Sequence, residues 1–169
     1  MYPSETYTSS NKKGKYLFIL ILMFTIIIST NYFALSVPAD TIEVIAKYPE
    51  TGKSSIYQIN FIVSKAIHPR AGFRVTFSDG FDLSDLMIAG STTINGGFDL
   101  SVEKQVVIIK RSGLGREIPA NEKVDIKFAI VKNPREPRDD YKIVVEILDE
   151  TEKSIVKQEK LLKVLPQKQ

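Results

Sequence analysis

Three aspartates spaced three residues apart are the clearest candidates for chemistry in this sequence. Asp79, Asp82 and Asp85 fall in a segment that begins with the turn signal Asp79-Gly80. Calcium takes six to eight oxygen ligands, and carboxylates close together in a loop supply several of them. The segment lacks the Asp-x-Asp-x-Asp-Gly spacing and the distant glutamate of calcium-binding loops. Aspartates also begin turns and cap short helices, so we favour a structural role and keep a calcium site as the alternative.

The residue types on which most catalytic and metal sites depend are scarce. The 169-residue chain contains no cysteine and one histidine, His68. Within this chain there is therefore no disulfide, no thiolate nucleophile and no cysteine-ligated or multi-histidine metal site. His68 has no acid or nucleophile at a diagnostic spacing, and we interpret the acidic pair Asp139-Asp140 as solvated charge in a turn. The sequence predicts a protein that is not an enzyme and that, calcium apart, uses no cofactor.

A weak phosphate-loop motif occurs at Ser112-Gly113-Leu114-Gly115-Arg116, where two glycines follow a predicted strand. Phosphate-cradling loops have a third glycine or a lysine and lead into a helix. Because this segment has none of these features, we interpret it as a hairpin turn.

The first 39 residues have the composition of a targeting segment. A lysine cluster at residues 12–15 precedes an apolar run at 16–28, and small residues follow at Val37-Pro38-Ala39. A basic flank, a short apolar core and a small-residue cleavage site are the three parts of a secretory signal peptide. We favour a signal peptide over residues 1–39 that is cleaved after Ala39.

The alternative is an uncleaved signal anchor, a single apolar helix with its core at residues 16–37. That length approaches the ~20 residues that a bilayer requires, and the lysine cluster would stay cytoplasmic. Both alternatives predict an exported domain over residues 40–169. The domain is secreted or periplasmic if the segment is cleaved, and membrane-anchored facing outside the cytoplasm if it is not.

The predicted exported domain is close to electrically neutral. Without Glu5 and the three lysines that precede the apolar run, the chain has 20 basic and 19 acidic residues. Nucleic-acid binding depends on neutralising phosphates with an excess of basic side chains. The sequence therefore predicts no nucleic-acid partner.

From residue 41 on, apolar side chains recur at every second position, which is typical of half-buried strands. In residues 123–130, for example, Val124, Ile126, Phe128 and Ile130 alternate with polar or small residues. Further segments with this alternation lie at residues 41–46, 57–63, 73–77 and 141–147. Turn signals separate the segments about every ten residues, which is the spacing of a two-layer sandwich or a barrel.

Two other segments carry different patterns. Val106–Ile109 is continuously apolar, which predicts a strand covered on both faces. Residues 152–165 fit a helix, because three apolar residues can share one helical face there. We favour two strands, because Val156-Lys157-Gln158 continues the register of a hairpin whose loop is Asp149–Lys153.

Three turns occur in a fixed order among the predicted strands: Ala71-Gly72, Gly80-Phe81 and Asn133-Pro134. This order resembles immunoglobulin-like β-sandwich modules of bacterial and archaeal cell-surface and envelope proteins, over roughly residues 41–155. The chain departs from the pattern at Ser78-Asp79, where a proline commonly precedes the glycine. The resemblance implies an all-β fold, a two-sheet antiparallel sandwich, here preceded by the one N-terminal apolar helix. It brings no shared catalytic residues.

The sequence as a whole predicts a non-catalytic, extracytoplasmic structural or protein-interaction module of the cell envelope. Its expected partners are envelope or surface proteins, together with the membrane if the N-terminal segment is uncleaved. The alternative is a ligand-binding module that takes calcium or carbohydrate at the end loops of the sandwich.

Overall fold

The computed structural model describes residues 40–167 of the chain. Within that range the protein forms nine β-strands and no helix. The predicted signal peptide or anchor, with its apolar helix and its cleavage point, lies outside the described residues. Residues 40–167 contain no helix that is long and apolar enough to cross a membrane.

Two of the nine strands are absent from the sequence prediction. The strands are β1 (Thr41–Ala46), β2 (Ser54–Ile62), β3 (Gly72–Phe77), β4 (Ile88–Gly90), β5 (Phe98–Glu103), β6 (Val106–Arg111), β7 (Lys123–Lys132), β8 (Arg138–Leu148) and β9 (Ser154–Val164). The missed β4 has three residues, too few to display a period of two. The missed β5 does alternate, with Phe98, Leu100 and Val102 packed against the core, so its signal is present in the sequence.

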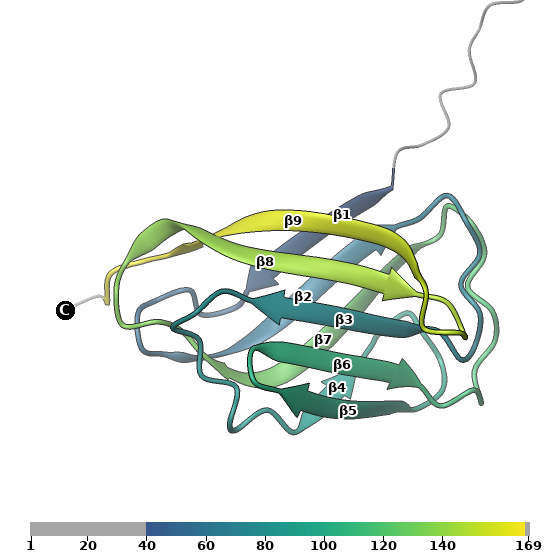
Figure 1. Cartoon of the computed structure of the whole chain (residues 1–169), viewed down its shortest axis with the longest axis horizontal. Helices are drawn as coiled ribbons and strands as arrows, with labels where there is room; N and C mark the ends of the chain where they lie inside the picture. The colour runs from purple at the N-terminus through teal and green to yellow at the C-terminus, as the bar shows by residue number, and fades with distance from the viewer. Residues whose placement is uncertain (1–39, 168–169) are drawn as a thin grey trace, which may run out of the picture. The chain divides into compact units, whose positions relative to one another are not determined.

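The strands form two sheets packed face to face (Figure 1). One sheet has the order β1-β2-β7-β4 and the other β5-β6-β3-β8-β9, and neighbouring strands in each pair antiparallel. In Figure 1 the five-stranded sheet lies in front of the four-stranded sheet. This architecture confirms the predicted all-β, two-sheet antiparallel sandwich.

The core lies between the inner faces of the two sheets and is rich in aromatic rings. The rings of Tyr57 on β2 and Phe77 on β3 meet edge to face at 5.4 Å, and Phe77 lies 5.0 Å from Phe81. Contacts of this kind contribute ~0.5–1.5 kcal/mol per pair beyond the burial of the rings. Because each strand supplies the core from one face only, the period-two pattern of the sequence follows directly from this packing.

The strand β6 has one buried face instead of the two that were predicted. Val107 and Ile109 are fully buried, whereas Val106 and Ile108 are half-buried on the outer face of the sheet. The prediction of a strand covered on both faces is therefore wrong.

The C-terminal segment is a single strand, β9, which pairs with β8 along its length. The helical alternative is therefore wrong, and the two strands that we favoured are one. The predicted hairpin loop precedes it: Asp149 Oδ1 accepts hydrogen bonds from the backbone nitrogens of Thr151 at 2.9 Å and Lys153 at 3.0 Å. An aspartate side chain that accepts hydrogen bonds from backbone nitrogens a few residues later in the chain stabilises a turn.

The segment 112–116 connects the two sheets, because β6 and β7 belong to different sheets. Our interpretation of it as a hairpin turn is therefore wrong. The buried guanidinium of Arg111 fixes its path by donating to the carbonyl oxygens of His68 at 2.9 Å and Arg116 at 2.6 Å. Burial lowers the pKa of Arg111. Gly115 packs so closely that an added Cβ would lie 2.2 Å from the carbonyl oxygen of Asn95.

Buried Asn133, in the predicted Asn-Pro turn, ties the turn after β1 to the core. Its Nδ2 donates to the carbonyl oxygens of Tyr48 at 2.7 Å and Glu50 at 2.8 Å. Its Oδ1 accepts a hydrogen bond of 2.6 Å from the Tyr57 hydroxyl, and burial raises the pKa of Tyr57. The residue that follows β9, Leu165, forms a parallel bridge with Glu50 in the same region.

Candidate functional site

The three aspartates predicted as a site lie in the connection between β3 and β4, in different environments. Asp82 Oδ1 accepts hydrogen bonds from Ser84 N at 3.0 Å and Ser84 Oγ at 2.7 Å, and these bonds lower the pKa of the Asp82 carboxyl. The backbone of Asp82 also forms a bridge with Lys132. The backbone carbonyl of Asp85 accepts a hydrogen bond from β7, and Asp79 is exposed. Asp82 therefore has the structural turn role that we favoured.

A hollow of about 560 Å³ adjoins this connection and is lined by Asp82 with Ser84, Lys104 and Gln105. Asp79 and Asp85 do not line it. Among residues 40–167, no three His, Cys, Asp or Glu side chains converge to hold a metal ion. Calcium here would take most of its ligands from carbonyl groups and water. Calcium binding by Asp79, Asp82 and Asp85 stays a prediction, tested by a rise in Tm on adding calcium chloride that EDTA reverses.

His68 and Asp140, for which the sequence predicts no catalytic role, both bind neighbouring residues of the chain. His68 is exposed, and its Nδ1 accepts a hydrogen bond of 3.2 Å from the backbone nitrogen of Arg70. Asp139 and Asp140 lie at the start of β8 and not in the expected turn. Arg138 donates to the Asp140 carboxylate at 2.8 and 2.9 Å, which lowers the pKa of Asp140.

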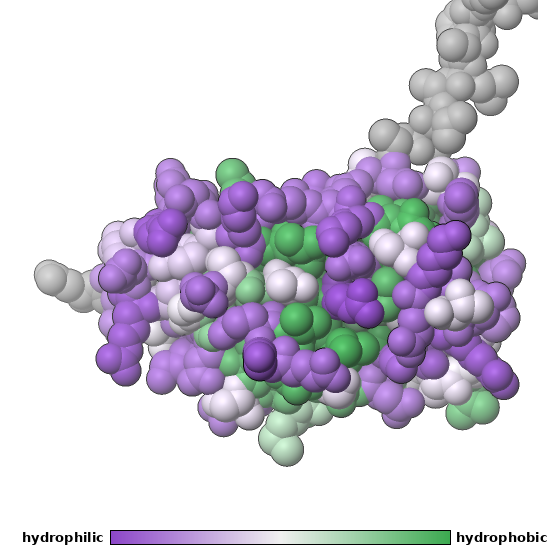
Figure 2. All heavy atoms as spheres, in the orientation of Figure 1, coloured by the Kyte–Doolittle hydropathy of each residue, from purple (hydrophilic) through white to green (hydrophobic). Residues whose placement is uncertain are grey.

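The outer face of the five-stranded sheet carries three half-buried apolar side chains, Val106, Ile108 and Val144, which we call the apolar strip. Thr76 of β3 pairs with Val106 on one side and Val144 on the other, so one row crosses three strands. Figure 2 shows apolar side chains gathered in the middle of this face with hydrophilic side chains around them. An apolar centre with a polar rim is the usual composition of a protein–protein contact surface.

Ion pairs between neighbouring strands flank the apolar strip. The Glu146 carboxylate lies 3.8 Å from Arg74 Nη1 and 3.4 Å from Lys157 Nζ. Lys142 Nζ lies 3.0 Å from Glu159 Oε1. The Lys142–Glu159 pair is exposed on both sides, and ion pairs of that kind contribute ~0–1 kcal/mol to stability. Together the ion pairs form a rim beside the apolar strip in which three cations, Arg74, Lys142 and Lys157, are paired with two carboxylates, Glu146 and Glu159.

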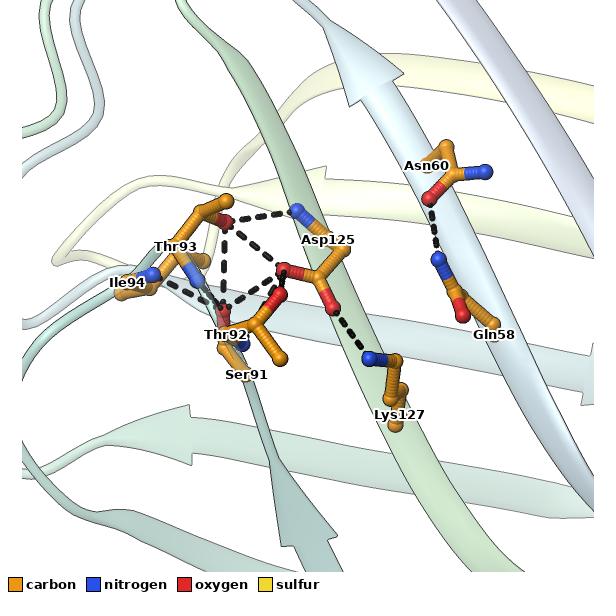
Figure 3. Close-up of polar contacts among 8 residues, drawn as sticks. All are labelled: Gln58, Asn60, Ser91, Thr92, Thr93, Ile94, Asp125 and Lys127. Atoms are coloured by element: carbon orange, nitrogen blue, oxygen red, sulfur yellow. Dashed lines mark hydrogen bonds and ion pairs between the residues drawn. The ribbon is translucent and has the colours of Figure 1, made fainter.

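On the outer face of the four-stranded sheet, Asp125 of β7 is 5% exposed. The loop after β4 surrounds its carboxylate (Figure 3). Asp125 Oδ1 accepts hydrogen bonds from Thr92 N at 3.1 Å, Thr92 Oγ1 at 2.7 Å and Thr93 Oγ1 at 2.8 Å. Asp125 Oδ2 lies 3.3 Å from Lys127 Nζ. The carboxylate therefore joins the loop to β7.

Two opposing effects act on the Asp125 carboxyl. Burial raises its pKa, whereas the hydrogen bonds from Thr92, Thr93 and Lys127 lower it, and the net result is a pKa lowered to about 2. Hydrogen bonds to the charged form are strong enough to outweigh desolvation in this way. The side chain is consequently ionised at neutral pH although it is buried.

Polar side chains extend from Asp125 across β2 to β1. Asn60 pairs in register with Asp125 on one side and Glu43 on the other. Gln58 Nε2 donates to Asn60 Oδ1 at 2.7 Å, and Asn60 Nδ2 donates to Glu43 Oε2 at 3.1 Å. Two hollows of about 230 and 310 Å³ adjoin here and share Asn60 and Lys123. We call this surface the polar groove, formed by Glu43, Gln58, Asn60, Lys123 and Asp125 with Thr92 and Thr93.

The polar groove is not among the sites predicted from the sequence. The alternation in β7 places Asp125 on the outer face, but it carries no information about the loop that covers the carboxylate. That loop comes from a segment more than thirty residues earlier in the chain. The run of hydroxyl residues Ser91-Thr92-Thr93 is the sequence feature that accompanies this site.

No protein-family model and no curated protein matches the sequence. A cohesin module from a family 33 glycoside hydrolase of Clostridium perfringens has a similar structure, with a TM-score of 0.50 and 14% sequence identity. The match covers 76% of this chain and 96% of that chain. The domain is an immunoglobulin-like β-sandwich. This confirms the resemblance stated from the sequence.

Two further solved structures are similar at lower scores. A non-cellulosomal cohesin from the archaeon Archaeoglobus fulgidus has a TM-score of 0.44 at 12% identity, over 72% of this chain and 91% of that chain. The major pilin SpaD from Corynebacterium diphtheriae has a TM-score of 0.47 at 12% identity, over 71% of this chain. The match spans 33% of the pilin's own length. At these identities the likeness is one of fold.

Proposed function

We propose that this β-sandwich is a non-catalytic interaction module displayed outside the cytoplasm, and that it binds a surface or envelope protein through the apolar strip. The observation that carries the proposal is the composition of that face. Val106, Ile108 and Val144 are apolar at positions where the outward side of an antiparallel strand is normally polar. The ion pairs around them give the face the polar rim of a contact surface.

The position of the apolar strip in the sheet favours binding without rearrangement. Val106 and Val144 lie on strands that flank β3, and both strands are hydrogen-bonded to it. Side chains on a rigid sheet lose little freedom when a partner docks, and this lowers the entropic cost of association. The face therefore suits a partner that recognises a fixed surface.

Two further features support the proposal. The lysine-flanked apolar run at residues 16–28 favours export of the domain, with the segment cleaved or retained as an anchor. The carboxylates singled out in the sequence are bound by neighbouring side chains: Asp82, a calcium candidate, by Ser84, and Asp140 by Arg138. A binding role does not require that these carboxylates be available for proton transfer.

Site-specific photo-crosslinking in cells that produce the full chain tests this proposal. A photoreactive residue at Val144, in the apolar strip, is expected to give a discrete adduct with one surface or envelope protein. The matched position is Ile45, which is 40% exposed on the outer face of the other sheet. Adducts at Val144 but not at Ile45 support the proposal. No adduct at Val144, or the same adducts at both positions, contradicts it.

A further inference from the structure

We propose that the polar groove on the outer face of the four-stranded sheet binds a neutral oligosaccharide. This is a second binding site, on the face opposite the apolar strip, and it does not depend on the protein partner proposed there. From the sequence, carbohydrate binding was an alternative expected at the end loops of the sandwich. The structure instead brings the suitable side chains together across β1, β2 and β7.

The lining of the polar groove matches the chemistry of sugar hydroxyls. A hydroxyl both donates and accepts hydrogen bonds, so it pairs best with a surface that offers both kinds of group. Glu43 offers carboxylate oxygens, Gln58 and Asn60 offer amides, and Lys123 offers an ammonium group. Thr92 and Thr93 add hydroxyls at the Asp125 end of the groove.

The charges of the polar groove favour an uncharged ligand. Glu43 and Asp125 bring two negative charges to the groove and Lys123 brings one positive charge. Lys127 lies outside the groove on the same face, and its ion pair with Asp125 offsets the remaining negative charge. A surface with balanced charge exerts little net attraction on a phosphorylated, sulfated or cationic ligand. A neutral glycan gains hydrogen bonds here without bringing an unbalanced charge.

Internal hydrogen bonds already hold the lining in place. Asn60 is fixed between Gln58 and Glu43, and the Asp125 carboxylate is fixed by Thr92 and Thr93. Side chains ordered before binding lose less entropy when a ligand arrives. This matters for sugars, because each hydrogen bond to a protein replaces one to water and its net gain is small.

The groove also offers an aliphatic contact for the C–H face of a sugar ring. Ile62 lines one of the two hollows, and it pairs in register with Thr41 and Lys123. Neighbouring strands lie ~4.8 Å apart, so the span from β1 to β7 is ~10 Å. A site of this extent accommodates more than one ring, which favours an oligosaccharide over a monosaccharide.

The test is saturation-transfer difference NMR on the full chain as isolated from cells. The probes are cellohexaose, chitohexaose, mannohexaose and laminarihexaose, each at about 5 mM, a concentration suited to millimolar affinity. At least one is expected to give a saturation-transfer signal. The double variant Gln58→Ala/Asn60→Ala is expected to weaken binding of that sugar about tenfold, because two hydrogen-bonding amides are lost.

The matched control is Thr76→Ala/Ser101→Ala, which removes two polar side chains from the outer face of the other sheet and should leave binding unchanged. If the double groove variant does not fold, Lys123→Ala replaces it, since Lys123 is exposed, and an affinity loss of about threefold is expected. No signal with any of the four sugars overturns the proposal. Equal weakening by the groove variant and the control also overturns it.

Discussion

At the scale of single residues, two buried polar side chains stabilise the domain, Asp125 in its charged form and Tyr57 in its neutral form. Asp125 keeps its charge under a loop because hydroxyl and backbone donors surround one of its oxygens. Tyr57 stays neutral, and its hydroxyl reaches Asn133 through the aromatic core. Each arrangement makes a specific prediction, because the loss of one partner leaves the other buried and without its hydrogen bond.

The lowered pKa of Asp125 makes stability depend on acidity. An unfolded aspartate titrates near pH ~3.9, above the folded pKa of about 2. The stabilisation is therefore complete above pH ~4 and is lost as the pH falls through about 2, with a total of ~2 kcal/mol. In urea unfolding, Asp125→Asn should be less stable than the wild type at pH 7, and the difference should shrink toward pH 2. A difference that is constant with pH would contradict this account.

Removal of the Tyr57 hydroxyl tests the buried network at Asn133. In Tyr57→Phe the ring is kept, but Asn133 Oδ1 loses its 2.6 Å hydrogen bond. We expect a loss of ~1–3 kcal/mol in the free energy of unfolding, since a buried acceptor is left without a donor. Denaturant unfolding measures it, and Tyr48→Phe is the control because Tyr48 is 43% exposed. Equal effects of the two substitutions would exclude the buried hydrogen bond as the cause.

At the scale of elements, the connection from β6 to β7 depends on glycine. An added Cβ at Gly115 would lie 2.2 Å from the Asn95 carbonyl oxygen and 2.9 Å from Arg111 Nη2. Gly115→Ala should therefore destabilise the domain by ~1–3 kcal/mol, because the backbone and the buried guanidinium must move apart. Gly90→Ala in β4 is the matched control, since nothing lies within 4 Å of its added Cβ. The Tm of both variants gives the comparison, and a similar Tm for the two would refute this close packing.

The strands that the sequence predicted are those in which apolar and polar residues alternate within the strand itself. Strands such as β7 and β8 alternate because one side chain in two enters the core, and that rhythm is visible without a structure. The prediction for β6 was wrong because Val106 and Ile108 are apolar but face outward, and apolar side chains on an outer face give the same sequence pattern as a second buried face. The prediction of a hairpin turn at residues 112–116 was wrong because two glycines suit a hairpin turn and a connection between two sheets equally well.

The candidate sites were less predictable, because they depend on contacts between distant segments. The aspartate pattern correctly located a turn at Asp82, whose carboxylate binds Ser84 two residues away. The environment of Asp125 depends on Thr92 and Thr93, and the polar groove also needs Glu43 from β1. No local spacing encodes those distances, since tertiary pairing of β1, β2 and β7 creates them.

At the scale of the whole molecule, the two outer faces of the sandwich differ in kind. The five-stranded sheet presents the apolar strip of Val106, Ile108 and Val144 inside a rim of ion pairs. The four-stranded sheet presents amides, carboxylates and lysines in the polar groove. The sheets are separated by a core of interdigitating rings, so a ligand on one face leaves the other face free. The two contacts that we propose would therefore be compatible with each other.

The directions of the first and last strands have a mechanical consequence. β1 and β9 run the same way along one side of the sandwich, as the hydrogen bond from Gln158 Nε2 to the Asp40 carbonyl and the parallel bridge between Glu50 and Leu165 require. The start of β1 and the end of β9 therefore lie at opposite ends of the domain (Figure 1). Tension between those points would pull both strands along their own axes and load the ladders to β2 and β8 in shear. Many backbone bonds would then have to break together, so the domain should transmit pulling force without extending.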